Sequence, residues 1–546
     1  MKKFRRRRVF AGLGIAAVAS FGLVACGGGS GSDGGEGGTL RATYAVFPES
    51  MDPQLAYTAE GWNSIYNTYI PLLTYAHAED EAGSTVIPGL AKSLPEISNG
   101  GKTYTLELRQ GLKYSDGRPV KASDFKYAVE RMFRLNSGGS AFYTDIVGAE
   151  DFQRTRKGGI SGIETDDRSG KITIDLVKPR GPFTNELAMP FVALVPPGSP
   201  SKDATTDPPP ATGPYALSSV KPGQSWSYER NPEWLRNNAE LMPDLPSGHV
   251  DRIEISVIRN QSTEVNEVEQ GRMDVMLDPV PPDRLPEVKQ RFEGTQFRTE
   301  PSVSTYFFWM NTARPPFDDL GVRKAVNYAV DPEALSRISG GTLAPSQQIL
   351  PPGMPGYEKF ALYPHDMAKA KAMIAAAAPS DREITVWTDN VSPNLEAGEY
   401  YEDLLGQLGF DTTLKTLGDN YFTTISNLST PELDTGFGNW SEDYPHPNDF
   451  FEPLLDGDSI APTFNTNLSQ LDDPALNQRV AELATKQLNP EVESQYAALD
   501  REFMELAPMA PYGTRSLSLF VSDAIDFESV IWNPTFSADF TSFRFK

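Results

Sequence analysis

A single cysteine, Cys26, stands among the 546 residues of this chain. One thiol cannot form an internal disulfide, and it cannot build a cysteine-ligated metal cluster. Packing must therefore hold the fold together, and 39% of the residues are hydrophobic and 10% aromatic. This composition excludes wholesale disorder and is sufficient for sizeable cores.

The position of this cysteine indicates an export signal. Residues 1–8 (MKKFRRRR) are basic, residues 9–25 carry no charge, and Cys26 follows directly. A basic segment followed by an apolar segment and small residues is the layout of a secretory signal. Residues 23–26 (LVAC) resemble the lipobox of bacterial lipoproteins, in which the cysteine is acylated and becomes the new N-terminus. We therefore expect residues 1–25 to be a lipoprotein signal peptide and Cys26 to carry the lipid.

Residues 26–38 are expected to form a lipidated glycine- and serine-rich tether, since such sequences behave as flexible coils. The predicted location is the extracytoplasmic face of a bacterial cell membrane, with the protein a lipid-anchored monomer. An uncleaved N-terminal anchor helix is the alternative. Arg7 and Arg8 precede the apolar run, so the general secretory and the twin-arginine export routes both stay open.

Charge and motif content argue against nucleic-acid binding and against catalysis. The formal net charge is −24, and an acidic surface repels phosphate backbones. The sequence contains no GxSxG nucleophile motif, no HExxH zinc motif and no GxxxxGK[ST] phosphate loop. We expect no enzymatic activity, no cofactor, no metal site and no nucleic-acid partner, so binding becomes the leading function.

From Thr39 onward, strand patterns alternate with amphipathic helix patterns, which predicts mixed α/β layers. Apolar residues that alternate with polar ones predict half-buried strands at 104–108, 172–176 and 253–257. Apolar residues with helical spacing predict buried helix faces at 125–133, 322–330 and 492–506.

Residues 104–133 (YTLELRQGLKYSDGRPVKASDFKYAVERMF) resemble the signature of family 5 solute-binding proteins, the peptide- and nickel-binding receptors of ATP-binding-cassette (ABC) importers. Similar segments follow the family order at 51–75 (opening with MDP), 211–217 (ATGPYAL), 310–335, 439–451 (NWSEDYPHPNDFF) and 507–513 (APMAPYG). Ordered matches over most of the mature chain are specific, whereas one match alone would be weak.

This resemblance implies a two-lobed α/β fold of the periplasmic-binding-protein (Venus flytrap) type, in which two crossing segments let the lobes close over a ligand. The first lobe is expected to comprise residues 39–300 and 510–546, with 76–188 as an extra subdomain. The second lobe is expected to comprise residues 303–508.

The resemblance also implies where a ligand would be held. In peptide-binding relatives an aspartate of the WxxDY loop pairs with the ligand α-ammonium group, and here Asp443 follows Trp440 and Ser441 in that motif. A bound cation recovers much of the cost of burying a lone carboxylate. In the alternative, Asp443 or Asp449 caps the following helix and Trp440 fills a core.

On the opposite lobe, relatives present backbone groups to an extended ligand after the MDP turn. Main-chain pairing of this kind lets one receptor accept many peptide sequences. The residues implied there are Tyr57, Thr58 and Ala59, and the residues expected to line the cleft after the strand ITVW are Thr388, Asp389 and Asn390.

The sequence departs from the family in two places. Where oligopeptide receptors have tyrosines in the final hinge strand, this chain has Gly513, Thr514 and Arg515. Arg515 either holds a ligand carboxylate or bridges acidic surface groups. Glu442 places a second acid beside Asp443, which favours a more cationic ligand.

The sequence thus predicts a lipid-anchored extracytoplasmic receptor that captures oligopeptides and delivers them to an ABC transporter permease. Closure around the ligand would create the surface that the permease recognises, so binding must favour the closed state. Another cargo on the same fold is the first alternative: a nickel chelate, an oligosaccharide or a cationic small molecule. A surface peptidase or hydrolase is the alternative from a different class.

Overall fold

The computed structural model describes residues 37–418 and 420–546. The predicted signal peptide, Cys26 and most of the predicted tether lie outside the described residues. In the described part, no helix combines the length and the apolar character that crossing a membrane requires.

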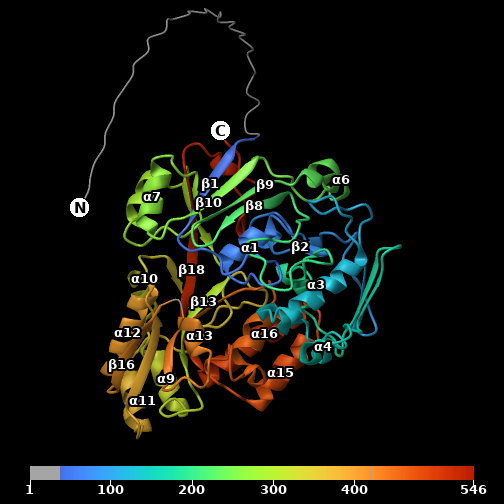
Figure 1. The fold of residues 1–546 in the computed structure, drawn as a ribbon. Coiled ribbons are helices and arrows are strands. Elements are labelled where there is room, and N and C mark those ends of the chain that lie inside the picture. The colour runs from blue at the N-terminus through green and yellow to red at the C-terminus, as the bar shows by residue number, and fades with distance from the viewer. Residues whose placement is uncertain (1–36, 419) are drawn as a thin grey trace, which may run out of the picture. The chain divides into compact units, whose positions relative to one another are not determined.

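A twelve-stranded sheet runs through the described part (Figure 1). Its path is β16-β15-β17-β13-β18-β11-β1-β10-β9-β8, and β12 and β14 also pair with β18. We define two sections of this sheet. The first section contains β1 (Thr39–Tyr44), β8 (Tyr215–Lys221), β9 (Ser225–Arg230), β10 (Arg252–Val257), β11 (Val275–Met276) and β12 (Phe297–Pro301). The second section contains β13 (Ser304–Met310), β14 (Leu343–Pro345), β15 (Glu383–Asp389), β16 (Asp411–Leu417) and β17 (Thr435–Ser441).

One long strand, β18 (Met509–Val521), belongs to both sections. As far as Arg515 it pairs with β13 and β14, and from Ser516 onward it pairs with β12 and β11. The second crossing lies between β12 and β13, where Ser302 Oγ donates a hydrogen bond of 2.6 Å to the carbonyl of Arg515. The two crossings are therefore in contact with each other.

A separate four-stranded sheet has the order β4-β5-β7-β6. Its strands are β4 (Glu96–Ser98), β5 (Thr103–Glu107), β6 (Ile163–Asp166) and β7 (Lys171–Asp175). Tyr104, Leu106, Ile172 and Ile174 are buried, as the alternating pattern predicted. The remaining strands form two small sheets. In one, β2 (Leu73–Tyr75) pairs with β3 (Val86–Pro88), and in the other β19 (Trp532–Asn533) pairs with β20 (Ser537–Ala538).

The three predicted helix faces are buried in α3 (Ala122–Arg134), α9 (Leu320–Ala329) and α16 (Pro490–Leu506). In α3, for example, Phe125, Val129 and Met132 are fully enclosed. The longer of the other helices are α1 (Ala59–Tyr66), α4 (Ala149–Thr155), α7 (Gln261–Glu269), α8 (Leu285–Phe292), α10 (Pro332–Ile338), α11 (Met367–Ala377), α12 (Asn394–Gln407), α14 (Asn448–Leu455) and α15 (Pro474–Ala484). Shorter helices are α2 (Asp80–Gly83), α5 (Phe183–Glu186), α6 (Ala239–Leu241) and α13 (Tyr421–Ile425).

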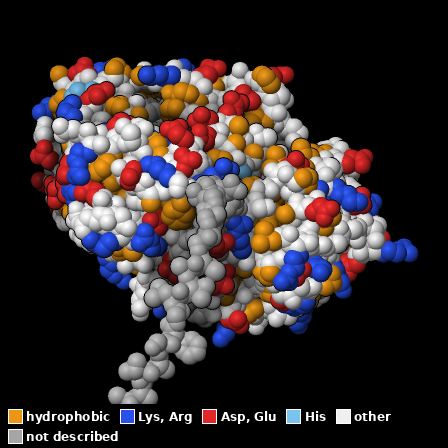
Figure 2. All heavy atoms as spheres, turned by 90° about the horizontal axis from the view of Figure 1, so that it is seen from above, with side chains coloured by type: hydrophobic (Ala, Val, Ile, Leu, Met, Phe, Trp, Pro, Cys, Tyr) orange, Lys and Arg blue, Asp and Glu red, His pale blue; other side chains and the backbone are white. Residues whose placement is uncertain are grey.

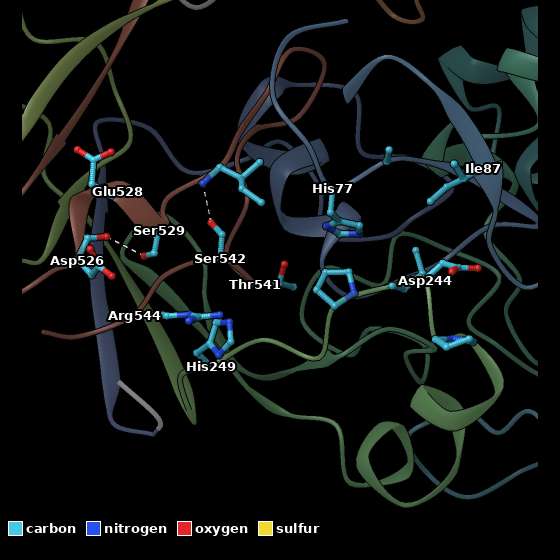
Figure 3. Close-up of a pocket in the computed structure, with 15 residues that line it drawn as sticks. His77, Ile87, Asp244, His249, Asp526, Glu528, Ser529, Thr541, Ser542 and Arg544 are labelled. Atoms are coloured by element: carbon cyan, nitrogen blue, oxygen red, sulfur yellow. Dashed lines mark hydrogen bonds between the residues drawn. The ribbon is translucent and has the colours of Figure 1, made fainter. Parts of the chain in front are cut away.

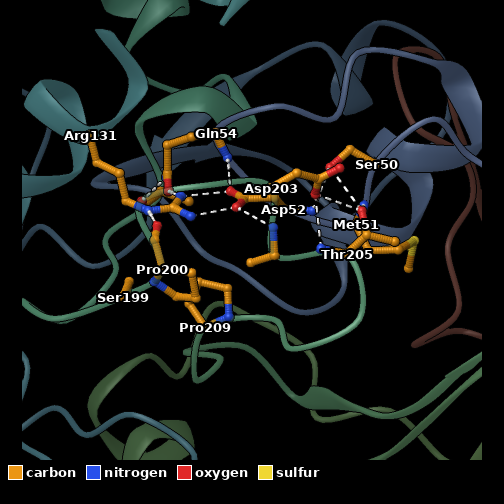
Figure 4. Close-up of polar contacts among 12 residues, drawn as sticks. Ser50, Met51, Asp52, Gln54, Arg131, Ser199, Pro200, Asp203, Thr205 and Pro209 are labelled. Atoms are coloured by element: carbon orange, nitrogen blue, oxygen red, sulfur yellow. Dashed lines mark hydrogen bonds and ion pairs between the residues drawn. The ribbon is translucent and has the colours of Figure 1, made fainter. Parts of the chain in front are cut away.

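The MDP turn is fixed to α3 by a buried ion pair (Figure 4). Arg131 Nη1 donates to Asp52 Oδ1 at 2.7 Å and to Gln54 Oε1 at 2.6 Å, and its Nε donates to the carbonyl of Pro200 at 2.9 Å. The backbone amide of Ala204 also donates to Asp52, at 3.2 Å. The bidentate arginine and the further donors compensate the cost of burying the Asp52 carboxylate. This turn is therefore a rigid base for the residues that follow it.

Several hydrophobic clusters make up the core. The largest is built mainly from residues 56–245, and it includes Tyr444, which comes from the loop after β17. The ring of Tyr444 meets the edge of Phe142 with the centroids 6.0 Å apart. Two further clusters pack against the strands of the second section. On the face shown in Figure 2, acidic and basic side chains are interspersed.

Candidate ligand site

The loop after β17 brings together residues that are far apart in the sequence. Tyr57 donates its hydroxyl hydrogen to Asp443 Oδ2 at 2.7 Å, and Thr535 Oγ1 donates to Glu442 Oε1 at 2.9 Å. The amide of Asp443 donates to Asp449 Oδ2 at 2.8 Å. We call Glu442, Asp443 and Asp449 the acidic cluster. The cluster lies where the loop of the second sheet section contacts Tyr57, whose ring packs on Trp62 and Phe191 of the largest hydrophobic cluster.

The contacts of this loop show whether Asp443 or Asp449 caps the helix that follows it, α14. Helix α14 begins at Asn448, its N-cap residue is Pro447, and no side chain forms a cap hydrogen bond there. In this structure Asp443 accepts a hydrogen bond from Tyr57, and Asp449 accepts one from the amide of Asp443. Neither carboxylate is therefore bonded as an N-cap of this helix.

The acidic cluster is strongly desolvated. Glu442 and Asp443 are each 8% exposed and Asp449 is fully buried. Burial raises the pKa of Glu442 to about 7 and that of Asp443 to about 7. Burial, reinforced by the charge of Asp443, raises the pKa of Asp449 well above its usual range. These carboxyl groups therefore favour protons or a bound cation near neutral pH.

Several other buried carboxylates in the described part have cationic partners. Asp52 pairs with Arg131, Glu186 with Arg180 and Asp539 with His77. Among the described residues, no lysine, arginine or histidine forms an ion pair with a member of the acidic cluster. An ammonium group that entered here would meet an uncompensated negative site.

Trp440 and Ser441 precede the acidic cluster at the end of β17. Trp440 is half-buried and Ser441 is exposed opposite Ser304 of β13. The indole of Trp440 faces the Asp449 carboxyl closely enough to act on it as a hydrogen-bond donor, which lowers the pKa of Asp449 against the effect of burial. Trp440 therefore belongs to the immediate surroundings of the acidic cluster.

The residues after the MDP turn are engaged within the chain. The amide of Thr58 donates to Glu49 Oε1 at 2.8 Å, and the amide of Tyr57 donates to the same oxygen. Thr58 also caps α1, with its Oγ1 accepting from the amide of Gly61 at 3.4 Å. Ala59 is exposed as the first residue of that helix. Of these residues, only Tyr57 is bonded to the acidic cluster.

A second polar group gathers around Asn394, which the sequence analysis did not single out. Arg515 Nη2 donates to Asn394 Oδ1 at 2.8 Å, and Asn394 Nδ2 donates to Asp389 Oδ2 at 2.9 Å. Thr388 Oγ1 donates to the Asn394 carbonyl at 3.1 Å. The guanidinium of Arg515 lies 4.2 Å from the ring centroid of Tyr306. This group unites Thr388, Asp389 and Arg515, while Asn390 is exposed beside it.

A cavity of about 730 Å³ lies elsewhere (Figure 3). His77, His249, Asp244, Asp526 and Arg544 contribute to its wall. Figure 3 shows Arg544 beside His249. None of the ligand-contact residues predicted from the sequence lines this cavity.

The sequence matches bacterial extracellular solute-binding proteins, family 5 Middle, over residues 85–461. The chain belongs to this family of extracellular solute-binding proteins, and it is a binding protein, not an enzyme. It is 27% identical to the oligopeptide-binding protein OppA of Bacillus subtilis (strain 168), over 80% of this chain and 82% of that protein. It is 24% identical to the probable D,D-dipeptide-binding periplasmic protein DdpA of Escherichia coli (strain K12), over 76% of this chain and 77% of that protein.

Among solved structures, the fold is similar to that of the clavulanic acid biosynthesis oligopeptide binding protein 2. The TM-score is 0.84 at 26% identity, and the match covers 93% of this chain and 96% of that chain. The predicted two-lobed α/β fold is thereby confirmed.

Proposed function

We propose that this protein captures oligopeptides outside the cell and holds the ligand α-ammonium group at Asp443. The observation that carries the proposal is the acidic cluster: its carboxylates are buried where the two sheet sections approach, and among the described residues none has a cationic partner. Desolvation makes such a site costly when empty and favourable for a cation. The two relatives named above, whose names state that they bind oligopeptides and dipeptides, support a peptide as the source of that cation.

The lobes would close over the ligand at the contacts around Tyr57 and Asp443. In our proposal the first lobe comprises residues 39–300 and 510–546, with the extra subdomain at 76–188, and the second comprises residues 303–508. The crossings at Ser302 and Arg515 would flex, and the ligand would bridge the lobes near Tyr57 and Asp443. A ligand that contacts both sides binds the closed state better, so it shifts the population toward closure.

The other candidate residues would complete the peptide site. Trp440 would present its indole and Ser441 its hydroxyl beside the ligand N-terminus. Thr58 would offer its amide once Glu49 releases it, and Ala59 would offer its main-chain groups. Arg515 would bind the ligand carboxylate, because its buried Nε has no hydrogen-bond partner within the described part. The remaining cleft residues in the proposal are Thr388, Asp389 and Asn390.

We also propose that the protein is a monomer, anchored through a lipid on Cys26, that delivers its cargo to an ABC transporter permease. Stable anchoring takes two signals or chains, which a diacylated cysteine supplies. Replacement of Cys26 by alanine is expected to move the protein from the membrane fraction into the soluble fraction of expressing cells. Immunoblotting of the fractions checks this, with the unchanged chain as control; membrane retention of the variant would contradict the lipid anchor.

The peptide proposal is tested by calorimetric titration of the purified protein with a tripeptide library. We expect saturable binding of free-amine tripeptides, because each can offer an ammonium group to Asp443. The alternative cargoes are titrated in parallel: a nickel chelate, an oligosaccharide and a polyamine. Binding of one of these with no uptake of any peptide would reject the peptide proposal and leave the binding-protein fold intact.

A further inference from the structure

Two large apolar side chains stay exposed where two strands of the second sheet section end. Val391 follows β15 and is 59% exposed, and Phe422 of α13 follows β16 and is 48% exposed. β15 and β16 are parallel neighbours whose last residues, Asp389 and Leu417, pair with each other, so both segments leave the sheet at one edge. Ligands of α/β sheets bind outside this carboxyl edge of the strands. We call Val391 and Phe422 the apolar pair.

A row of aromatic rings connects the apolar pair with a positive charge. The ring centroid of Phe422 lies 6.4 Å from that of Phe437, and the centroid of Phe437 lies 6.2 Å from that of Tyr306. The guanidinium of Arg515 stands 4.2 Å from the centroid of Tyr306. An exposed ring therefore lies at one end of this row and a cation at the other.

Arg515 has unused hydrogen-bonding capacity. Within the described part only its Nη2 donates a side-chain hydrogen bond, to Asn394 Oδ1, and its buried Nε has no partner. The amide of Asn394 donates to the carbonyl of Val391 at 2.8 Å, which connects Arg515 with the apolar pair. Asp389 acts on Arg515 electrostatically, but its carboxylate is bonded to Asn394 and to the amide of Val391 instead. A guanidinium in this state is suited to bind a ligand carboxylate.

The strand order sets the separation between Arg515 and the loop of Asp443. β17 ends at Ser441, just before that loop, and it pairs with β13, which in turn pairs with the part of β18 that precedes Arg515. One strand therefore lies between β17 and β18, which places them about 10 Å apart at the usual strand spacing. An extended tripeptide is also about 10 Å long. A short peptide can thus reach from Asp443 to Arg515.

We propose that this receptor prefers short peptides whose C-terminal residue has an aromatic or large aliphatic side chain. This inference rests on the proposed function, because it takes the ligand N-terminus to lie at Asp443. Arg515 holds the C-terminal carboxylate, and Phe422 and Val391 are the specificity-determining residues that pack against the last side chain. The hydrogen bond between Tyr57 and Asp443 is already formed in this structure while the apolar pair stays exposed, so that contact does not cover the pair.

The test is calorimetric titration of the whole protein with three tripeptides: Ala-Ala-Phe, Ala-Ala-Ala and the C-terminal amide of Ala-Ala-Phe. We expect Ala-Ala-Phe to bind about tenfold tighter than Ala-Ala-Ala, because burial of an aromatic ring contributes on this scale. The amide keeps the ring and removes the carboxylate charge. It is expected to bind about tenfold weaker than the free acid, since its charge-assisted bond to Arg515 is lost.

Three variants assign the two effects to their residues. Phe422→Ala and Val391→Ala are each expected to reduce the preference for Ala-Ala-Phe over Ala-Ala-Ala severalfold, and both side chains are exposed enough for the fold to tolerate the change. Val177→Ala is the matched control: this valine follows β7 and is also 59% exposed, and its replacement should leave the preference unchanged. Arg515→Gln should bring the affinities of the acid and the amide close together.

The outcomes separate this inference from the function on which it rests. Equal affinity for Ala-Ala-Phe and Ala-Ala-Ala would overturn the preference and leave peptide capture standing. A preference that persists unchanged in both variants of the apolar pair would also overturn it, and so would an amide that binds as tightly as the acid, because the assigned residues would then not contact the peptide C-terminus. No binding of any peptide would reject the proposed function itself, and the inference with it.

Discussion

Replacing Asp443 with asparagine is expected to weaken the binding of free-amine peptides by about 100-fold. Asparagine is nearly the same size and still accepts the hydrogen bond from Tyr57, so the loop should keep its position. The substitution removes the negative charge that would pair with the ligand ammonium group. Calorimetric titration of the variant and the unchanged protein with one tripeptide measures the ratio.

An N-acetylated form of the same tripeptide is the control for this variant. It has no α-ammonium group, so it should bind more weakly than the free-amine peptide. Its affinity should be almost the same for the variant and for the unchanged protein. Equal losses of affinity for the free and the acetylated peptide would show that Asp443 supports the loop structurally and does not contact the ligand charge.

The affinity measured in the same titration is expected to increase as the pH rises toward neutrality. Burial raises the pKa of Asp443 from 3.8 to about 7, so the empty site binds a proton below that pH. A group with a raised pKa stabilises the folded empty protein at low pH, and this contribution is lost as the pH rises through about 7. A cation displaces the proton, so affinity for a free-amine peptide should rise from about pH 6 to about pH 7.5, above which the peptide ammonium group itself loses its proton. Asp443→Asn should flatten this rise.

Replacing Arg131 with methionine is expected to lower the free energy of unfolding by about 3 to 5 kcal/mol. The variant would leave Asp52 as an uncompensated buried charge and would remove the hydrogen bonds from Arg131 to Gln54 and Pro200. Urea denaturation followed by tryptophan fluorescence measures the change as a shift of the midpoint.

Arg154→Met is the matched control for this stability experiment. The Arg154 side chain pairs with Asp151 on the surface, with side chains 73% and 78% exposed, and exposed pairs contribute at most about 1 kcal/mol. Similar effects of the two substitutions would contradict the structural role that we give to the ion pair beneath the MDP turn.

Regular elements were largely predictable because their signal is local. The apolar spacing at Phe125, Val129 and Met132 marks the buried face of α3 in the sequence, and Ile253 and Ile255 mark β10 in the same way. The family resemblance added the two-lobed fold, which periodicity alone could not give. The partition into lobes at particular residues, like the ligand contacts, stays a prediction.

The site was predictable only in part, because its contacts depend on tertiary pairing. The WxxDY motif directed attention to Asp443, but the partner hydroxyl of Tyr57 lies 386 positions away in the chain. No sequence motif marked Asn394, although it connects Asp389 with Arg515. Glu49 gave no signal in the sequence, yet it accepts the amide hydrogens of two predicted ligand residues. Such contacts become visible only when both segments are placed in space.

The position of the peptide N-terminus in a crystal structure of the complex with a free-amine tripeptide is the most direct test of the central claim. We expect the peptide between the two lobes, with its ammonium nitrogen about 2.7 to 3.2 Å from a carboxylate oxygen of Asp443. A peptide bound outside the interlobe region, or one whose N-terminus points away from the acidic cluster, would contradict the claim.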